Sequence, residues 1–237
     1  MNICIVIIGI KERQPLIDRI CKQVKVNYIL LDENKRGPLN SVITFLKSLN
    51  WENFTHTIFL QDDAYLCNNF LNISNSIIKT HPDKVVGLFP WDFLDSFIVP
   101  INNGIPYYDV GTLSGVGIIF PNIYANDYLD FAVSSPYPNQ DDLTLQLFCE
   151  QKGIDMIQTV PAVVQHCDNG SYWNCDKGFN ERRVKYFELN PIANWESTKV
   201  NYLKYHSHRE KLIAEKIEWS KKYIKNLVKE RSQNNDK

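Results

Sequence analysis

The stretch TIFLQDD, residues 57–63, decides the fold that this sequence predicts. Its first four residues are apolar or β-branched and have the length and composition of a buried strand. Two carboxylates, Asp62 and Asp63, come after that strand with only Gln61 between. Such a pair can be a solvated turn, because Asp is a frequent turn residue. It can also belong to a ligand site, because ligands of open α/β sheets bind beyond the carboxyl ends of the strands.

The segments that precede this stretch favour a ligand site. Continuous apolar runs over 2–9 and 26–31 alternate with helical spacing of apolar residues over 14–24 and 38–49. This alternation predicts an α/β fold: a Rossmann-like, mainly parallel sheet with flanking helices on both faces. Gly9 and Asp32 end the first two strands, as the Asp pair ends the third. We therefore expect these residues to converge at one edge of the sheet.

The second half of the chain continues the pattern less regularly. Helical or strand character is expected over 69–80 (helix), 85–89 (strand), 118–120 (strand) and 157–164 (strand interrupted by Pro161). Ser114-Gly115 leads into the strand at 118, and Gln140-Asp141-Asp142 precedes a helical pattern. A carboxylate in that position can simply cap the helix. His166 follows the last strand, where a structural role is the alternative to a ligand role.

Length and composition indicate one main domain and a basic C-terminal extension. The chain has 237 residues, of which 44% are hydrophobic and 22% charged, and we place the domain over 1–200 and a helical extension over 201–237. The helix expected over 204–231 carries nine basic and four acidic residues, so its net charge is +5 against about −6 for the rest. That helix can be a solvated face or a polyanion contact.

Several classes of protein are disfavoured by the sequence. No apolar run is long enough to span a bilayer, and the N-terminal run lacks the features of a signal peptide, so we expect a cytoplasmic protein with six reduced cysteines. Neither GxGxxG nor GxxxxGK[ST] occurs, which argues against dinucleotide and P-loop sites. Zinc-site cysteine and histidine spacings are also missing. The Asp pairs and His166 instead offer hard ligands that suit Mg²⁺ or Mn²⁺.

In the order of these motifs the chain resembles the nucleotide-sugar-dependent glycosyltransferases of GT-A fold. The resemblance covers about residues 1–175 and rests on the N-terminal apolar strand, the strand ending at Asp32, Gln61-Asp62-Asp63, Ser114-Gly115, Gln140-Asp141-Asp142 and Val164-Gln165-His166. Gln61 stands where the family has the first Asp of its Asp-x-Asp motif. The family's metal-binding position, the last Asp of that motif, falls on Asp63.

The resemblance implies a role for each matching residue. Asp63 would ligate Mn²⁺ or Mg²⁺, and His166 would complete the metal site. The donor, a nucleotide-diphosphate sugar and most simply a UDP-sugar, would be contacted by Gly9, Arg13, Asp32, Arg36 and Asp62. In inverting members the acidic position that corresponds to Asp142 removes the proton of the acceptor hydroxyl.

The acceptor and two rival functions stay open at this point. Small GT-A-like enzymes of phages include ones that glycosylate hydroxymethylated bases in DNA, so a hydroxymethylated pyrimidine in phage DNA is one acceptor, acted on in the host cytoplasm. A bacterial surface glycan is another. A carboxylate-metal hydrolase or nuclease would use the same residues, and a non-catalytic binding domain would keep them without turnover.

Overall fold

The computed structural model describes residues 2–90, 107–109, 113–137, 139–167, 187, 189–190 and 200–201. The chain divides into two compact units, Met1–Asn201 and Tyr202–Lys237, and the described residues all belong to the first. The basic helix expected over 204–231 therefore lies outside the described residues. The extension, and its boundary with the domain at residue 200, stay predictions.

Ten strands and seven helical segments make up the described secondary structure. The strands of the large sheet are β1 (Ile3–Gly9), β2 (Tyr28–Leu31), β3 (His56–Gln61), β5 (Val85–Gly87), β6 (Tyr107–Asp109), β7 (Gly117–Pro121), β8 (Met156–Thr159) and β10 (Val200–Asn201). A small second sheet consists of β4 (Ala64–Leu66) and β9 (Val164–His166). The helices are η1 (Lys11–Arg13), α1 (Gln14–Gln23), α2 (Pro38–Lys47), α3 (Phe70–Thr80), η3 (Asn122–Tyr124), α4 (Ala125–Val133) and α5 (Asp141–Lys152).

The large sheet is mixed but mainly parallel, in the order β10-β6-β8-β5-β7-β3-β1-β2. Strands β2, β1, β3, β5 and β8 run in one direction, whereas β7, β6 and β10 run in the opposite one. The predicted α/β class with a mainly parallel sheet and flanking helices is thus confirmed. The neighbouring strands β1, β2 and β3 bring their carboxyl ends to the same edge, as the sequence predicts.

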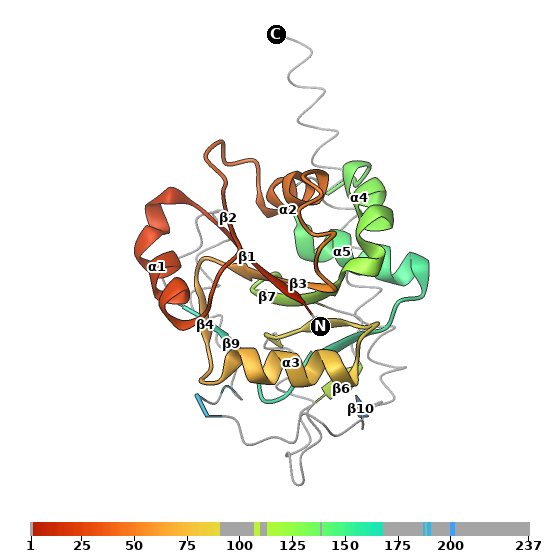
Figure 1. Ribbon diagram of the computed structural model, residues 1–237. Coiled ribbons are helices and arrows are strands. Elements are labelled where there is room, and N and C mark those ends of the chain that lie inside the picture. Colours follow the sequence, from red (N-terminus) through yellow and green to blue (C-terminus); the bar gives the residue numbers. More distant parts are fainter. Residues whose placement is uncertain are drawn as a thin grey trace, which may run out of the picture. The chain divides into compact units, whose positions relative to one another are not determined.

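Helices cover both faces of the sheet (Figure 1). Strand β1 contributes buried side chains to the core on each of these faces. Ile5 and Ile7 of β1 pack in one core cluster with buried residues of α1 and α3. Cys4, Val6 and Ile8 pack in the other cluster, with residues of α2, α4 and α5. Because successive side chains of a strand point to opposite faces, a strand buried on both sides needs an unbroken apolar run. This requirement explains the sequence ICIVIIG.

Two expectations about the second half need correction. The segment 157–164 is not one strand: β8 ends at Thr159 in the large sheet, and β9 begins at Val164 and pairs with β4 in the small sheet. Pro161 stands between them and has no N–H to donate to a sheet. The strands β4, β6 and β10 and the helix α4 were not predicted.

No helix in the described parts of the chain is long and apolar enough to cross a membrane. The cysteines that the structure describes, at positions 4, 21, 67, 149 and 167, are free thiols.

Candidate active site

The end of β1 packs directly against Asp62, and this contact is the centre of the candidate site. A Cβ atom added to Gly9 would lie 2.5 Å from the Cβ of Asp62 and 2.7 Å from its Oδ2. The backbone N–H of Ile10 donates to the same Oδ2 at 2.9 Å. Asp62 is only 4% exposed, so the absence of a side chain at Gly9 lets a buried carboxylate lie against the backbone of the neighbouring strand.

Arg13 joins the two carboxylates of the Asp pair. Its Nη1 lies 2.9 Å from Oδ1 of Asp62 and 2.7 Å from Oδ2 of Asp63. The short helix η1 positions this side chain, because the N–H of Arg13 donates to the carbonyl of Ile10 at 3.0 Å and turns the chain back over the strand ends. The guanidinium therefore supplies one positive charge to two buried negative charges.

The two carboxylates respond differently to burial. Burial raises the pKa of Asp62 above its ordinary value, although Arg13 and the N–H of Ile10 oppose the rise. Burial also opposes ionisation of Asp63, but His166 and Arg13 outweigh it and hold the pKa of Asp63 below its ordinary value. Asp63 is thus the member of the pair that stays ionised most firmly.

His166 reaches Asp63 through the small sheet. In the pairing of β4 with β9, Ala64 lies opposite His166, and the N–H of Cys167 donates to the carbonyl of Asp63 at 2.9 Å. This register places Nε2 of His166 3.2 Å from Oδ2 of Asp63. The sequence suggested this proximity only through the resemblance, because β4 was not predicted.

Asp63 and His166 fit a divalent metal in their chemistry. Oδ1 of Asp63 and Nδ1 of His166 are buried and have no hydrogen-bond partner in the described chain, and an unsatisfied buried polar atom calls for an explanation such as an ion. No group of three or more His, Cys, Asp or Glu side chains among the described residues is arranged to hold a metal. A site with two protein ligands would depend on substrate phosphates and water, as Mg²⁺ sites commonly do.

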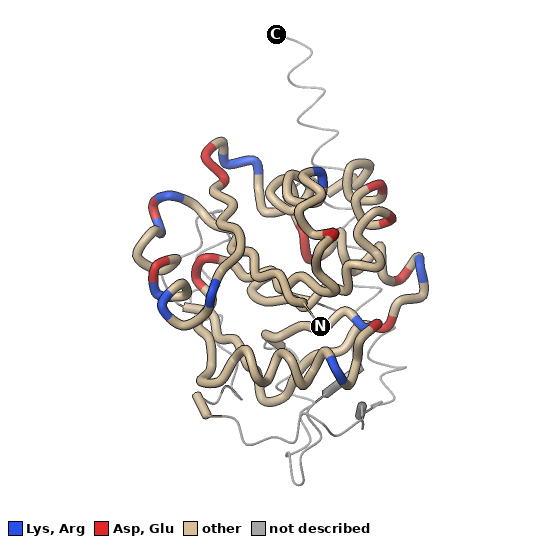
Figure 2. The backbone as a smooth tube through the Cα atoms, viewed as in Figure 1, with Lys and Arg blue, Asp and Glu red and all other residues tan. Residues whose placement is uncertain are grey.

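Asp32 organises the loop between β2 and α2. Its N–H donates to the carbonyl of Gly9 at 2.8 Å, and its carboxylate accepts the N–H groups of Arg36 at 2.9 Å and Gly37 at 2.6 Å. Arg36 is exposed, and Figure 2 shows acidic and basic residues close together in this loop. Asp32 therefore lies beside Gly9 as predicted, while the contacts of Asp32 and Arg36 with a nucleotide stay predictions.

A second acidic pair begins α5, and its buried member is Asp141. Asp141 is 9% exposed, whereas Asp142 is half-buried. A Cβ atom on Gly115 would lie 3.2 Å from both carboxylate oxygens of Asp141 and 2.8 Å from Nε2 of Gln61. Gln61 precedes Asp62 at the end of β3, so Gly115 lies next to both the end of β3 and Asp141.

Asp142 is the member of this pair that was predicted to be catalytic, and no role was predicted for Asp141. Helical spacing was the available signal: Asp141 shares a buried stripe of α5 with Leu145 and Phe148, four and seven residues later. Burial, followed by the charge of Asp142, raises the pKa of Asp141 to about 7. The N-cap is Gln140, which makes no side-chain capping bond, and Oδ1 of Asp142 accepts the N–H of Leu143 at 2.7 Å.

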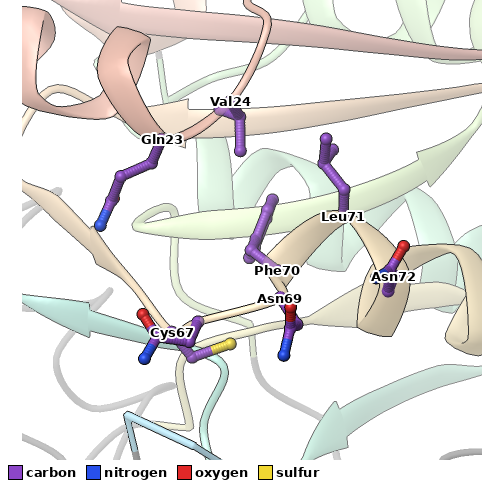
Figure 3. A pocket seen from close by; sticks show the side chains of 8 residues that line it. Gln23, Val24, Cys67, Asn69, Phe70, Leu71 and Asn72 are labelled. Atoms are coloured by element: carbon purple, nitrogen blue, oxygen red, sulfur yellow. The ribbon is translucent and has the colours of Figure 1, made fainter.

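A separate pocket of about 430 Å³ lies between the end of α1 and the start of α3 (Figure 3). Its lining is apolar or amide-bearing apart from Cys67, whose pKa burial raises to about 12. A thiol with that pKa stays protonated and unreactive near neutral pH. None of the predicted site residues lines this pocket.

Comparison with known proteins gives similarity in structure only. No family model and no curated protein matches the sequence. A197 from STIV is 15% identical, with a TM-score of 0.44 over 70% of this chain and 86% of that one. CTP:phosphocholine cytidylyltransferase (LicC) from Streptococcus pneumoniae is 10% identical, with a TM-score of 0.41 over 70% and 94%. A glycosyltransferase involved in glycosylation of the major capsid of PBCV-1 is 10% identical, with a TM-score of 0.30 over 63% and 76%. Transferases thus occur among the similar structures, but similarity at this level does not transfer an activity or a substrate to this chain.

Proposed function

We propose that this protein is a glycosyltransferase that moves a sugar from a nucleotide-diphosphate sugar, most simply a UDP-sugar, to an acceptor hydroxyl. One observation carries the proposal. The buried pair Asp62 and Asp63 meets Arg13 and His166 at the carboxyl edge of the sheet, and one buried oxygen of Asp63 has no partner. A strand-end site with hard ligands and a fixed positive charge suits a diphosphate and its metal.

The residues around the Asp pair would bind and orient the donor. The N–H of Ile10 holds the carboxylate of Asp62 in one orientation, which suits a contact with ribose or sugar hydroxyls. Asp63 and His166 would hold Mn²⁺ or Mg²⁺, which supplies neutralising charge to the leaving diphosphate. Gly9, Asp32 and Arg36 would lie along the nucleotide at the ends of β1 and β2.

The second acidic pair would handle the acceptor proton. We assign Asp142 as the general base: one of its carboxylate oxygens takes the proton of the acceptor hydroxyl while that oxygen forms the new bond to the sugar and the nucleotide diphosphate leaves. Asp141, with its pKa raised to about 7, would be protonated and uncharged below that pH. A protonated Asp141 leaves the charge on Asp142, where the role of base requires it.

The acceptor that we propose is a polyanion, namely DNA that contains a hydroxymethylated pyrimidine. Its support is the sequence alone: the segment 204–231 has a net charge of +5. A bacterial surface glycan is the alternative acceptor, and the salt dependence of binding distinguishes the two.

The test is release of free UDP from UDP-sugars in the presence of Mn²⁺ and acceptor, with Asp63→Ala as the variant. We expect transfer to fall at least about 100-fold, because the leaving group loses several kcal/mol of charge stabilisation and each 1.4 kcal/mol is about tenfold in rate. Asp130→Ala, an exposed Asp on α4, is the matched control and should keep wild-type activity.

Three outcomes would contradict the proposal. Full activity of Asp63→Ala, or undiminished activity in excess EDTA, removes the metal from the reaction. A protein that ignores nucleotide sugars but hydrolyses phosphodiesters is the carboxylate-metal hydrolase or nuclease. A protein that binds UDP-sugars without turnover is the non-catalytic binding domain.

A further inference from the structure

Arg13 lies against the oxygen of Asp63 that a metal shared with His166 would use. Its Nη1 lies 2.7 Å from Oδ2 of Asp63, and that same oxygen is the one that faces Nε2 of His166, at 3.2 Å. We propose that Arg13 is an internal counter-ion that competes with the divalent metal for Asp63 and gives it up when a diphosphate binds. The inference rests on the proposed function for the presence of a metal at Asp63.

The competition follows from charge and from space. Oδ2 is the oxygen of Asp63 that faces Nε2 of His166, at 3.2 Å, so an ion that uses both residues would lie on the side of Oδ2. A guanidinium at hydrogen-bond distance from that oxygen would be pressed against the incoming cation, and like charges at such distances repel strongly in a buried site. Arg13 cannot relieve this repulsion by losing a proton, because guanidinium stays charged in proteins. It can only move.

The anchoring of Arg13 allows that movement. Its backbone is fixed by the bond from its N–H to the carbonyl of Ile10, but its side chain is 16% exposed, against 5% for the side chains of Asp62 and Asp63. The proposed movement turns the guanidinium toward solvent, while the backbone of Arg13 and the Asp pair stay in place. A diphosphate at the strand ends is a partner that guanidinium binds well, through charge-assisted and often paired hydrogen bonds.

One consequence is coupling between the metal and the donor. A nucleotide that attracts Arg13 frees Asp63 and so strengthens metal binding. By thermodynamic reciprocity the metal then strengthens nucleotide binding by the same factor. In the nucleotide-free protein the metal should bind weakly, because Arg13 still holds both carboxylates.

The experiment measures the affinity of nucleotide-free protein for Mn²⁺ by electron paramagnetic resonance, in the full chain. Arg13→Gln and Arg13→Met should both bind Mn²⁺ more tightly than wild type, by about 5- to 150-fold, the usual range of coupling between sites. Lys11→Met is the charge-matched control: Lys11 is exposed on the same short helix, and its loss should leave the affinity near that of wild type. Asp63→Asn should abolish binding at this site.

The outcomes separate the inference from the proposed function. Unchanged or weaker Mn²⁺ binding in folded Arg13 variants, with loss of binding in Asp63→Asn, overturns the competition but leaves the metal site. If Asp63→Asn binds Mn²⁺ as wild type does, both ideas fail. If neither Arg13 variant folds, nuclear magnetic resonance of wild-type protein with ¹⁵N-labelled arginine is the alternative test. Saturating Mg²⁺ should shift the guanidinium signal of a buried arginine. An unchanged set of signals overturns the inference.

Discussion

The contact between Gly9 and Asp62 shows how one residue without a side chain can build a site. A methyl group at position 9 would need space that the Cβ, Cγ and Oδ2 atoms of Asp62 already fill, at distances of 2.5 to 2.9 Å. Asp62 cannot yield easily, because it is held by the N–H of Ile10 and by Arg13. Position 9 therefore has to be glycine, because the carboxylate of Asp62, just after the neighbouring strand β3, fills the space that a side chain would need.

Gly9→Ala should accordingly damage both stability and the site. We expect a loss of about 1–3 kcal/mol in the free energy of unfolding, the usual cost of overpacking, together with weaker binding of UDP in the presence of Mn²⁺. Urea unfolding and calorimetric titration measure the two effects.

Gly153→Ala separates strain from site damage. Gly153 ends α5 with a φ of +67°, and nothing lies within 4 Å of the position of its Cβ. This variant should lose stability through backbone strain alone and should bind UDP normally. Wild-type stability and UDP affinity in Gly9→Ala would show that Asp62 can move, and that the close approach does not define the site.

Among the elements, α5 holds both residues, Asp141 and Asp142, to which we assign the acceptor side of the proposed reaction. Its buried face runs from Asp141 through Thr144 and Leu145 to Phe148, so the helix places a carboxylate at the start of a mainly apolar face. Burial and the charge of Asp142 raise the pKa of Asp141 to about 7, whereas an unfolded Asp has a pKa near 3.8. The folded protein therefore holds this proton more tightly than the unfolded chain does between these two values.

The raised pKa predicts a pH-dependent gain in stability for Asp141→Asn. Protonated Asp141 contributes to the free energy of unfolding of the wild type. This contribution is fully present below about pH 4 and is lost as pH rises through about 7, because burial disfavours the ionised form only in the folded state. Asn has no charge to bury, so the variant should be more stable than wild type at pH 8, by up to about 4 kcal/mol, since one pKa unit is worth about 1.4 kcal/mol. Urea unfolding at several pH values measures the gain.

Asp142→Asn is the matched variant for this prediction. It should change stability little, because Asn serves at helix starts nearly as well as Asp, and should lower the transfer rate by about 10²- to 10⁴-fold if Asp142 is the base. A gain for Asp141→Asn that is equal at pH 4 and pH 8, or a loss at both, would show that Asp141 ionises normally.

The parts of this site that could be predicted from sequence are those that depend on strand ends. Gly9, Asp32 and the Asp pair follow apolar runs, and parallel pairing alone brings such positions to one edge. Asp141 could have been found by the same kind of argument, from helical spacing in α5. The contacts of Arg13 and His166 could not, because they depend on the turn of η1 and on the pairing of two three-residue strands, β4 and β9. Strands that short carry too little periodicity to be recognised.

On the scale of the whole molecule, charge is distributed unevenly along the chain. The segment 204–231 carries +5, and the rest of the chain about −6. An acidic body repels a phosphate backbone, so any contact with DNA would be confined to the basic segment. Phosphate contacts release counter-ions, and the logarithm of the affinity then falls with the logarithm of salt concentration by about 0.9 per phosphate.

The salt dependence of DNA binding should come from this basic segment. If the acceptor is DNA, about four phosphate contacts from the basic segment should give a slope of roughly −3 to −4, and replacing four of its lysines with Gln in the full chain should bring the slope close to zero. The variant changes Lys216, Lys221, Lys222 and Lys225. The matched control changes four exposed lysines of the body, Lys22, Lys25, Lys47 and Lys79, and should keep the wild-type slope. A neutral glycan acceptor would bind with almost no salt dependence, because it has no counter-ions to release. Equal slopes in the two variants would instead mean that the basic segment is a solvated helical face, and that the acceptor is recognised by the domain itself.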